Sequence, residues 1–215
     1  LVGNQRAPEV YDLLESSAKP YVNTYSFDDR LDHPNVGFDN WRAGETIVDH
    51  LAQLGHERIA IIAGITTDND RARARVQGIK SGLSRNGLHF NAEQYLECPY
   101  TLEAGRAALR TLMQRQPKPT AIICGNDILA CGAIFQCQRS NINVPGDLSI
   151  AGIDGLSIGG HVTPSLTTMS VPFYEMGELA ATLLLNRLNS TDKSSDKIEL
   201  KATLRIREST AAPRR

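Results

Sequence analysis

Residues 58–64, Arg58-Ile59-Ala60-Ile61-Ile62-Ala63-Gly64, form a continuous apolar run that ends in a glycine. A short run of this kind, rich in β-branched residues, predicts a strand that is buried on both faces. Two further runs of the same type occur at residues 121–124 and 148–153. Longer stretches whose apolar residues have helical spacing separate these runs. The alternation predicts a parallel sheet with helices on both faces.

The same pattern extends in both directions along the chain. Helices are predicted at residues 8–17, 41–54, 71–85, 102–115, 127–139 and 172–188. Further strands are predicted at 21–25, 94–98 and 198–206, with a polar loop at 189–197 and a frayed tail at 211–215. Leu1-Val2-Gly3 has the pattern of the end of a strand, so we expect the first sheet to have strands upstream of this chain.

Composition excludes several classes of protein. The 215 residues include 23 Lys and Arg against 24 Asp and Glu, so the formal net charge is −1. Without a positive field, we do not expect this chain to bind nucleic acid by itself. No apolar run approaches the roughly 20 residues of a membrane span, and the first residues lack the pattern of a signal peptide.

The four cysteines, at positions 98, 124, 131 and 137, show no C-x-x-C pair and no histidine at ligand spacing. Cys124 lies in a predicted strand and Cys131 in a predicted helix, so we expect buried free thiols. We predict no metal and no cofactor. Unpaired cysteines are also consistent with a reducing, cytoplasmic location.

Polar side chains follow four of the predicted strands. Arg75 lies just inside the helix after the 58–64 run, and Tyr100, Asn126 and Asp154 follow the next three strands. Ligands of open α/β sheets bind beyond the carboxyl ends of the strands, where these side chains meet. Guanidinium, amide and carboxylate groups bond hydroxyl pairs, and an aromatic ring packs on the C–H face of a sugar. The set therefore predicts a site for a neutral polyhydroxylated ligand.

Structural roles remain open for the same region. Asp127 is expected to be a helix N-cap, Asn126 is equally suited to a turn, and Asp154 before Gly155 suits a turn as well. Arg71 and Arg73 alternate with Arg75 along a helix, so we expect most of this basic group at the solvated surface. The sequence contains no nucleophile elbow, phosphate-binding loop or metalloprotease motif, so we predict no catalytic residues and no enzyme.

Several longer motifs point to one family. They are Val36-Gly37-Phe38-Asp39-Asn40, Leu51-Ala52-Gln53-Leu54-Gly55-His56-Glu57-Arg58-Ile59-Ala60, Gly125-Asn126-Asp127-Ile128-Leu129-Ala130-Cys131-Gly132-Ala133, Pro164-Ser165-Leu166-Thr167-Thr168 and Arg207-Glu208-Ser209-Thr210. Their combination resembles the effector-binding region of the lactose-repressor/galactose-repressor family of bacterial transcription regulators. The resemblance covers nearly the whole chain.

The resemblance implies a clamp of the periplasmic-binding-protein-like type I, an α/β fold with two doubly wound parallel-sheet subdomains. It assigns residues 1–38 and 173–196 to the first subdomain, which we expect to be incomplete in this chain. It assigns residues 39–171 and 198–210 to the second and leaves 211–215 as a tail. In the family, an operator-binding headpiece precedes these parts, so we expect it ahead of Leu1.

Carried over by motif position, the family's effector contacts fall on Arg75, Tyr100, Asn126, Asp154 and Phe173. Tyr25 stands where members that bind sugars often have an acidic residue, and Gly155 follows Asp154 where a second Asp is common. The expected function is effector binding and dimerisation in a sugar-responsive repressor, with a small metabolite and operator DNA as partners and a homodimer as the assembly. The alternative is a periplasmic sugar-binding protein of a transport system, which shares the clamp.

Overall fold

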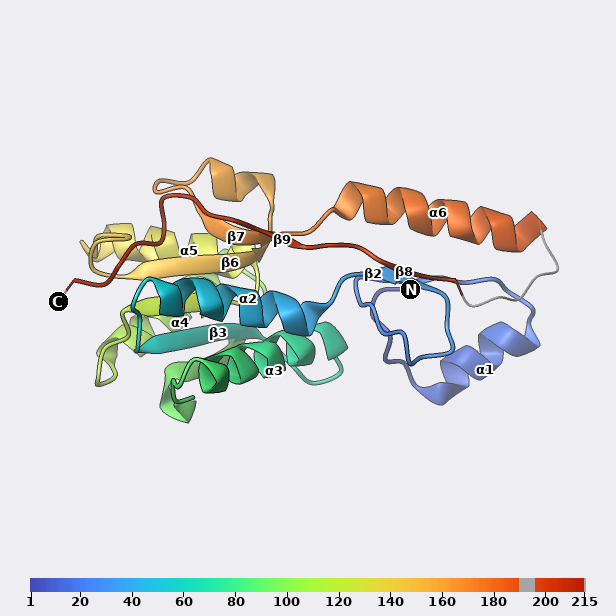
Figure 1. Ribbon diagram of the computed structural model, residues 1–215, viewed down its shortest axis with the longest axis horizontal. Helices are drawn as coiled ribbons and strands as arrows, with labels where there is room; N and C mark the ends of the chain where they lie inside the picture. The colour runs from blue at the N-terminus through green and yellow to red at the C-terminus, as the bar shows by residue number, and fades with distance from the viewer. Residues whose placement is uncertain (190–195, 215) are drawn as a thin grey trace.

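The computed structural model describes residues 1–189 and 196–214, and its strands form two separate sheets (Figure 1). The larger sheet has the order β4-β3-β5-β6-β7-β9, and its pairs are parallel except for β7 with β9. Its strands are β3 (Ile59–Gly64), β4 (Tyr95–Cys98), β5 (Ala121–Cys124), β6 (Ser149–Asp154), β7 (Thr167–Ser170) and β9 (Thr203–Arg205). The predicted α/β architecture is confirmed.

Strand β3 shows how the larger sheet is buried on both faces. Ile61 belongs to an apolar cluster with residues of α2 (Asn40–Gln53) and α3 (Asp70–Arg85). Its neighbour Ile62 belongs to a second cluster, with residues of α4 (Leu102–Gln114) and α5 (Asp127–Arg139). Successive side chains of a strand point to opposite faces, so each face receives alternate residues of the run. Each fully buried isoleucine contributes about 1.5–3 kcal/mol of transfer free energy.

The smaller sheet consists of β1 (Asn23–Thr24), β2 (Asn35–Gly37) and β8 (Lys197–Glu199), all parallel. Helix α6 (Phe173–Asn189) packs against β1 and β2. Helix α1 (Pro8–Ser16) lies on the other side of this sheet (Figure 1). The buried Tyr11 of α1 accepts a hydrogen bond of 3.1 Å from Asn23 Nδ2 and donates one of 2.9 Å to the Asn4 carbonyl.

Three segments connect the two sheets, and all of them are short: residues 38–39, 171–172 and 200–202. They bring the carboxyl ends of the smaller sheet's strands toward the larger sheet (Figure 1). The predicted boundaries of the two subdomains remain a proposal. We would move one of them, because β8 pairs with β2 and residues 197–199 therefore belong to the first sheet.

One predicted strand was wrong. Residues 198–206 form two strands, β8 and β9, in different sheets, because the chain crosses between the sheets at residues 200–202. Strands β2 and β7 were not predicted. Val2 forms an isolated parallel bridge with Thr24. Two short 3-10 helices, at Ala92–Gln94 and Ser157–Gly160, complete the elements of the described residues. The predicted loop at 189–197 falls mostly on residues 190–195, which lie outside the described part.

The prediction of a frayed tail was also wrong for residues 211–214, the part of the tail that the structure describes. Ala211 donates a backbone hydrogen bond of 3.1 Å to Ser149 Oγ, and its carbonyl accepts one of 2.9 Å from His56. Arg214 pairs with Asp147 at 2.8 Å.

The prediction of buried free thiols is confirmed for Cys124 and Cys131. Within the described ranges, no helix combines the length and apolar character needed to cross a bilayer.

Candidate functional site

Helices α2 and α3 contact each other backbone to backbone through two glycines. A Cβ added at Gly78 would lie 1.8 Å from the Trp41 carbonyl oxygen, and one added at Gly44 would lie 2.4 Å from the Arg75 carbonyl oxygen. Only a residue without a side chain fits at such a distance. The contact brings Arg75 of α3 next to Asn40, the first residue of α2.

Arg75 is the centre of the candidate site and is only 6% exposed. Its Nε donates a hydrogen bond of 2.8 Å to Asn40 Oδ1, and its Nη1 donates one of 2.6 Å to the Gly125 carbonyl. Its Nη2 lies 3.6 Å from Asp154 Oδ1. The planar guanidinium is therefore fixed by groups of α2, the β5–α5 turn and the end of β6.

Asp154 ends β6 in a strained backbone conformation. Its φ is 124°, a value that residues with a side chain rarely adopt, and Gly155 follows with a φ of 77°. Such strain costs on the order of 1–3 kcal/mol and is common at binding sites. Burial raises the pKa of the Asp154 carboxyl, and the charge of Arg75 opposes that shift. The conformation presents a largely buried carboxylate beside the guanidinium.

The prediction that Asp127 is a helix N-cap was wrong. Asn126 is the N-cap of α5, and its side chain accepts a hydrogen bond of 2.9 Å from the Leu129 N–H. Asp127 is fully buried and accepts bonds of 2.7 Å from the Leu156 N–H and 2.5 Å from the Thr168 hydroxyl. It thereby ties the segment after Asp154 to strand β7. Burial raises its pKa to about 6.

Tyr100 follows β4 and lies against the end of β3. A Cβ at Gly64 would be 2.0 Å from Tyr100 Cζ, so the glycine makes room for the ring. The side chain is 37% exposed, which leaves part of the ring open to a ligand. Burial raises the pKa of Tyr100, while the nearby charge of Arg75 lowers it and that of Asp154 raises it.

Tyr25 and Phe173 join the site from the side of the smaller sheet. Their ring centroids are 5.3 Å apart at an interplanar angle of 35°. The Tyr25 carbonyl accepts a hydrogen bond of 2.8 Å from Asn40 Nδ2, and Asn40 in turn holds Arg75. Asn40 thus connects the two halves of the fold, the one built on the smaller sheet and the one built on the larger sheet.

The structure therefore brings together Arg75, Tyr100 and Asp154, with Asn126 adjacent through the Gly125 carbonyl. Tyr25 and Phe173 are linked to them through Asn40 and the 171–172 connection. The sequence analysis missed Asn40, and it named Asp127 but assigned it the wrong structural role. Within residues 1–189 and 196–214, no group of three or more His, Cys, Asp or Glu side chains is arranged to hold a metal ion.

Arg71 and Arg73 are not the solvated surface that the sequence predicted. Arg71 Nη1 donates a hydrogen bond of 3.2 Å to the Val2 carbonyl, and Arg73 bonds the Gln5 side chain and the Thr66 carbonyl. The Asn4 N–H donates a bond of 2.8 Å to the Asp70 carboxylate. The start of α3 is therefore joined to the first residues of the chain.

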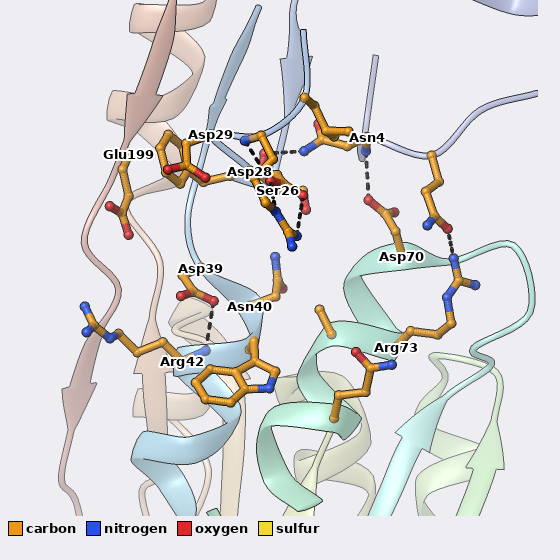
Figure 2. A pocket seen from close by; sticks show the side chains of 17 residues that line it. Asn4, Ser26, Asp28, Asp29, Asp39, Asn40, Arg42, Asp70, Arg73 and Glu199 are labelled. Atoms are coloured by element: carbon orange, nitrogen blue, oxygen red, sulfur yellow. Dashed lines mark hydrogen bonds and ion pairs between the residues drawn. The ribbon is translucent and has the colours of Figure 1, made fainter. Parts of the chain in front are cut away.

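A pocket of about 710 Å³ lies at the first turns of α2 and α3 (Figure 2). The strand-end residues predicted from the sequence do not line it. Its lining comes from segments far apart in the chain: Asn4, Gln5, residues 26–31, residues 39–42, Asp70, Arg73, Ala74, Gln77 and Glu199. Asn40 lies between this pocket and Arg75.

Comparison with known proteins agrees with this geometry. Residues 48–210 match the model of the periplasmic binding protein-like domain. The HTH-type transcriptional repressor CytR of Escherichia coli (strain K12) is 35% identical over 193 residues, which cover 90% of this chain and 56% of that protein. The chain thus spans little more than half of that relative.

Two solved structures are also similar. A LacI family transcriptional regulator from Mycobacterium smegmatis has a TM-score of 0.83 at 30% identity, covering 98% of this chain and 78% of that one. The transcriptional regulator CelR in complex with cellobiose has a TM-score of 0.87 at 27% identity, covering 97% of this chain and 64% of that one.

The two linked sheets, with a polar site at their facing edges, define a periplasmic-binding-protein-like domain. Within that class, the chain belongs to the lactose-repressor (LacI) family of transcriptional regulators.

Proposed function

We propose that this chain is the effector-binding and dimerisation region of a sugar-responsive transcriptional regulator, a repressor by analogy with CytR. The observation that carries the proposal is the position of the Arg75–Asp154 pair. Arg75 of α3 meets Asp154 at the carboxyl end of β6, and Asn40 connects Arg75 to Tyr25 in the other half of the fold. A ligand held there would touch both halves.

Each side chain has a chemical role in this proposal. Arg75 and Asp154 bond paired hydroxyl groups, and Asn126 fixes the orientation of the ligand through its amide nitrogen. Tyr100 packs on the apolar face of the ligand, and the Tyr25–Phe173 ring pair closes the side nearest the smaller sheet. The cellobiose bound to CelR supports a sugar or sugar derivative as the effector class.

The regulatory mechanism follows from linkage. An effector that binds one arrangement of the two halves better than another shifts their equilibrium by that difference in affinity. In a homodimer this changes the spacing of operator-binding headpieces outside this chain. The proposal therefore names operator DNA as a partner, places the protein in the cytoplasm and assigns it no catalytic activity.

A periplasmic sugar-binding protein of a transport system is the second candidate, since it shares the clamp. The regulators named above favour the first one.

The test is calorimetric titration of the full chain with pentoses, hexoses, disaccharides and nucleosides. We expect at least one of them to bind. Asp154→Ala should weaken the binding of that ligand by about 1–3 kcal/mol, because the ligand groups that bond Asp154 lose a charged acceptor. Asp12→Ala, an exposed change on α1, is the control. Unchanged affinity in Asp154→Ala would contradict the assignment of the site.

A further inference from the structure

A pocket at the amino ends of the larger sheet's strands lies far from the proposed effector site and shares no lining residue with the pocket of Figure 2. Its volume of about 340 Å³ is within the roughly 300–1,000 Å³ of small-molecule sites. Arg58, directly before β3, and Thr120, directly before β5, both line it. Asp154 is at the opposite end of the sheet, because a strand of six residues such as β6 spans about 17–20 Å. A ligand in this pocket is therefore out of reach of Asp154.

The C-terminal segment forms one wall of the pocket. Pro213 and Arg214 line it, and this part of the chain lies at the end of the larger sheet that is remote from the smaller sheet (Figure 1). The Ala211 carbonyl accepts a hydrogen bond of 2.9 Å from His56, and Arg214 pairs with Asp147 at 2.8 Å. Tertiary contacts therefore hold this wall in place without a ligand.

The pocket carries a net positive charge. Of the described residues that line it, Arg58, Lys118 and Arg214 are cationic and Asp147 is the one carboxylate. Both oxygens of Asp147 are already bonded, Oδ1 to Arg214 Nη1 at 2.8 Å and Oδ2 to the Asn143 N–H at 2.9 Å. Arg214 and Asp147 thus neutralise each other, and the charges of Arg58 and Lys118 remain for an anion.

The guanidinium of Arg58 is placed to receive that anion. Its Nε donates a hydrogen bond of 2.9 Å to the Lys118 carbonyl, which fixes the side chain beside the pocket. Neither Arg58 nor Lys118 forms an ion pair with a carboxylate of the described residues. The two Nη groups of Arg58 are left for an acceptor, and a guanidinium binds a carboxylate through two parallel hydrogen bonds.

The rest of the lining is largely apolar. Met113, Pro119, Ile142, Pro145 and Pro213 contribute apolar side chains to the pocket. Met113 and Ile142 pack on the apolar cluster of α4 and α5, and part of each remains exposed. Apolar surface that a ligand buries here contributes about 25 cal/mol per Å². The lining therefore favours an anion with an apolar body over a small inorganic anion.

From these observations we propose that this pocket binds a small carboxylate that carries an apolar or aromatic body. The carboxylate bonds Arg58 and Lys118, and the body packs on Met113 and the surrounding prolines. Because Pro213 and Arg214 form one wall, the bound ligand also fastens the C-terminal segment to the amino ends of β3 and β5. The site goes beyond the proposed function and does not depend on it.

The test is calorimetric titration of the full chain with benzoate and indole-3-acetate at millimolar concentrations, beside benzyl alcohol and inorganic phosphate. We expect the two carboxylates to bind at least tenfold more tightly than the alcohol, which lacks the charge, and than phosphate, which lacks the apolar body. Arg58→Gln and Lys118→Gln should each weaken the carboxylates roughly tenfold. Arg110→Gln, at an exposed position of α4 outside the pocket, is the matched control and should leave their affinity unchanged.

Met113→Ala tests the apolar part of the site. It should weaken benzoate about threefold or more and leave the affinity for phosphate unchanged. Thermal unfolding of each variant checks that it folds.

Three outcomes would overturn the proposal. Equal affinity for benzoate and inorganic phosphate would mean an adventitious ion only. Binding that stays within about twofold in both Arg58→Gln and Lys118→Gln, or no binding of either carboxylate, would exclude the site. Asp154→Ala should leave the benzoate affinity unchanged, and a loss there would place the carboxylate at the effector site instead and overturn the proposal as well. The effector site keeps its own test with sugars and nucleosides.

Discussion

The Arg75 guanidinium lies 3.6 Å from the Asp154 carboxylate, and both side chains are largely buried. The two groups come from elements on different strands of the larger sheet, α3 after β3 and the end of β6. Charge pairing lets Asp154 stay ionised in a place where burial alone raises its pKa. The pair therefore keeps a polar surface ready for ligand at modest cost to stability.

Arg75→Ala should destabilise the fold by about 3 kcal/mol, because it leaves Asp154 as an uncompensated buried charge. The double variant Arg75→Ala/Asp154→Ala should recover about 1 kcal/mol or more relative to the sum of the single variants. Urea unfolding of the four proteins at neutral pH measures this cycle. Strict additivity would show that the two groups do not interact.

Asp127→Asn should remove one component of the pH dependence of stability. Burial raises the pKa of Asp127 from 3.8 to about 6 in the folded chain. Between pH 3.8 and about pH 6 the folded state binds more protons than the unfolded state. The stabilisation that comes from protonating Asp127 is therefore complete below about pH 4 and is lost as the pH rises through 6. The loss amounts to about 2–3 kcal/mol.

Urea unfolding from pH 4 to pH 7 tests this prediction. The stability of the parent chain should fall relative to Asp127→Asn over that range, whereas Asp12→Asn should follow the parent. A constant difference between the parent and Asp127→Asn across the range would contradict the shifted pKa.

The fold was largely predictable because its central strands are short apolar runs, of which residues 58–64 are the clearest. Strands β2 and β7 were not predicted because neither is an apolar run. Strand β2 (Asn35–Gly37) has only three residues, and most side chains of β7 (Thr167–Ser170) carry hydroxyl groups. The split between β8 and β9 depends on the crossing at 200–202, a tertiary feature without a local turn signal.

The positions of Arg75 and Asp154 were predictable because Asp154 directly ends a strand and Arg75 lies in the helix that follows another strand. Asn40 was not, since its role depends on the glycine contact between α2 and α3. The pocket of Figure 2 joins Asn4, Ser26 and Asp70, which are distant in sequence and meet only in the folded chain.

His56→Ala should destabilise the chain more at pH 8 than at pH 5. His56 is buried and contacts Thr120 Oγ1 and Ser149 Oγ, each at 3.0 Å, and the Ala211 carbonyl at 2.9 Å. Burial lowers its pKa below the ordinary 6.5. As the pH falls, His56 is therefore protonated in the unfolded chain before it is protonated in the folded chain. The stabilisation that comes from the neutral, buried His56 is complete above pH 6.5 and is lost as the pH falls.

We expect a loss of about 1–3 kcal/mol at pH 8, where the serine, threonine and carbonyl groups lose a neutral partner. The loss should shrink at pH 5. Urea unfolding at the two pH values measures it, with the exposed His89→Ala as control. A larger loss at pH 5 than at pH 8 would mean that His56 is charged in the folded state.

Gly78→Ala should weaken both the fold and the site. Its Cβ would lie 1.8 Å from the Trp41 carbonyl oxygen, so α2 and α3 must separate, at a cost of about 1–3 kcal/mol. That movement lengthens the Asn40–Arg75 hydrogen bond and should reduce effector affinity as well. Gly177→Ala on α6 is the matched control, since its Cβ meets nothing within 4 Å. There the same change should stabilise the helix by up to about 1 kcal/mol. Thermal unfolding followed by Trp41 fluorescence compares the two variants, and equal midpoints would show that the helices do not depend on the glycine contact.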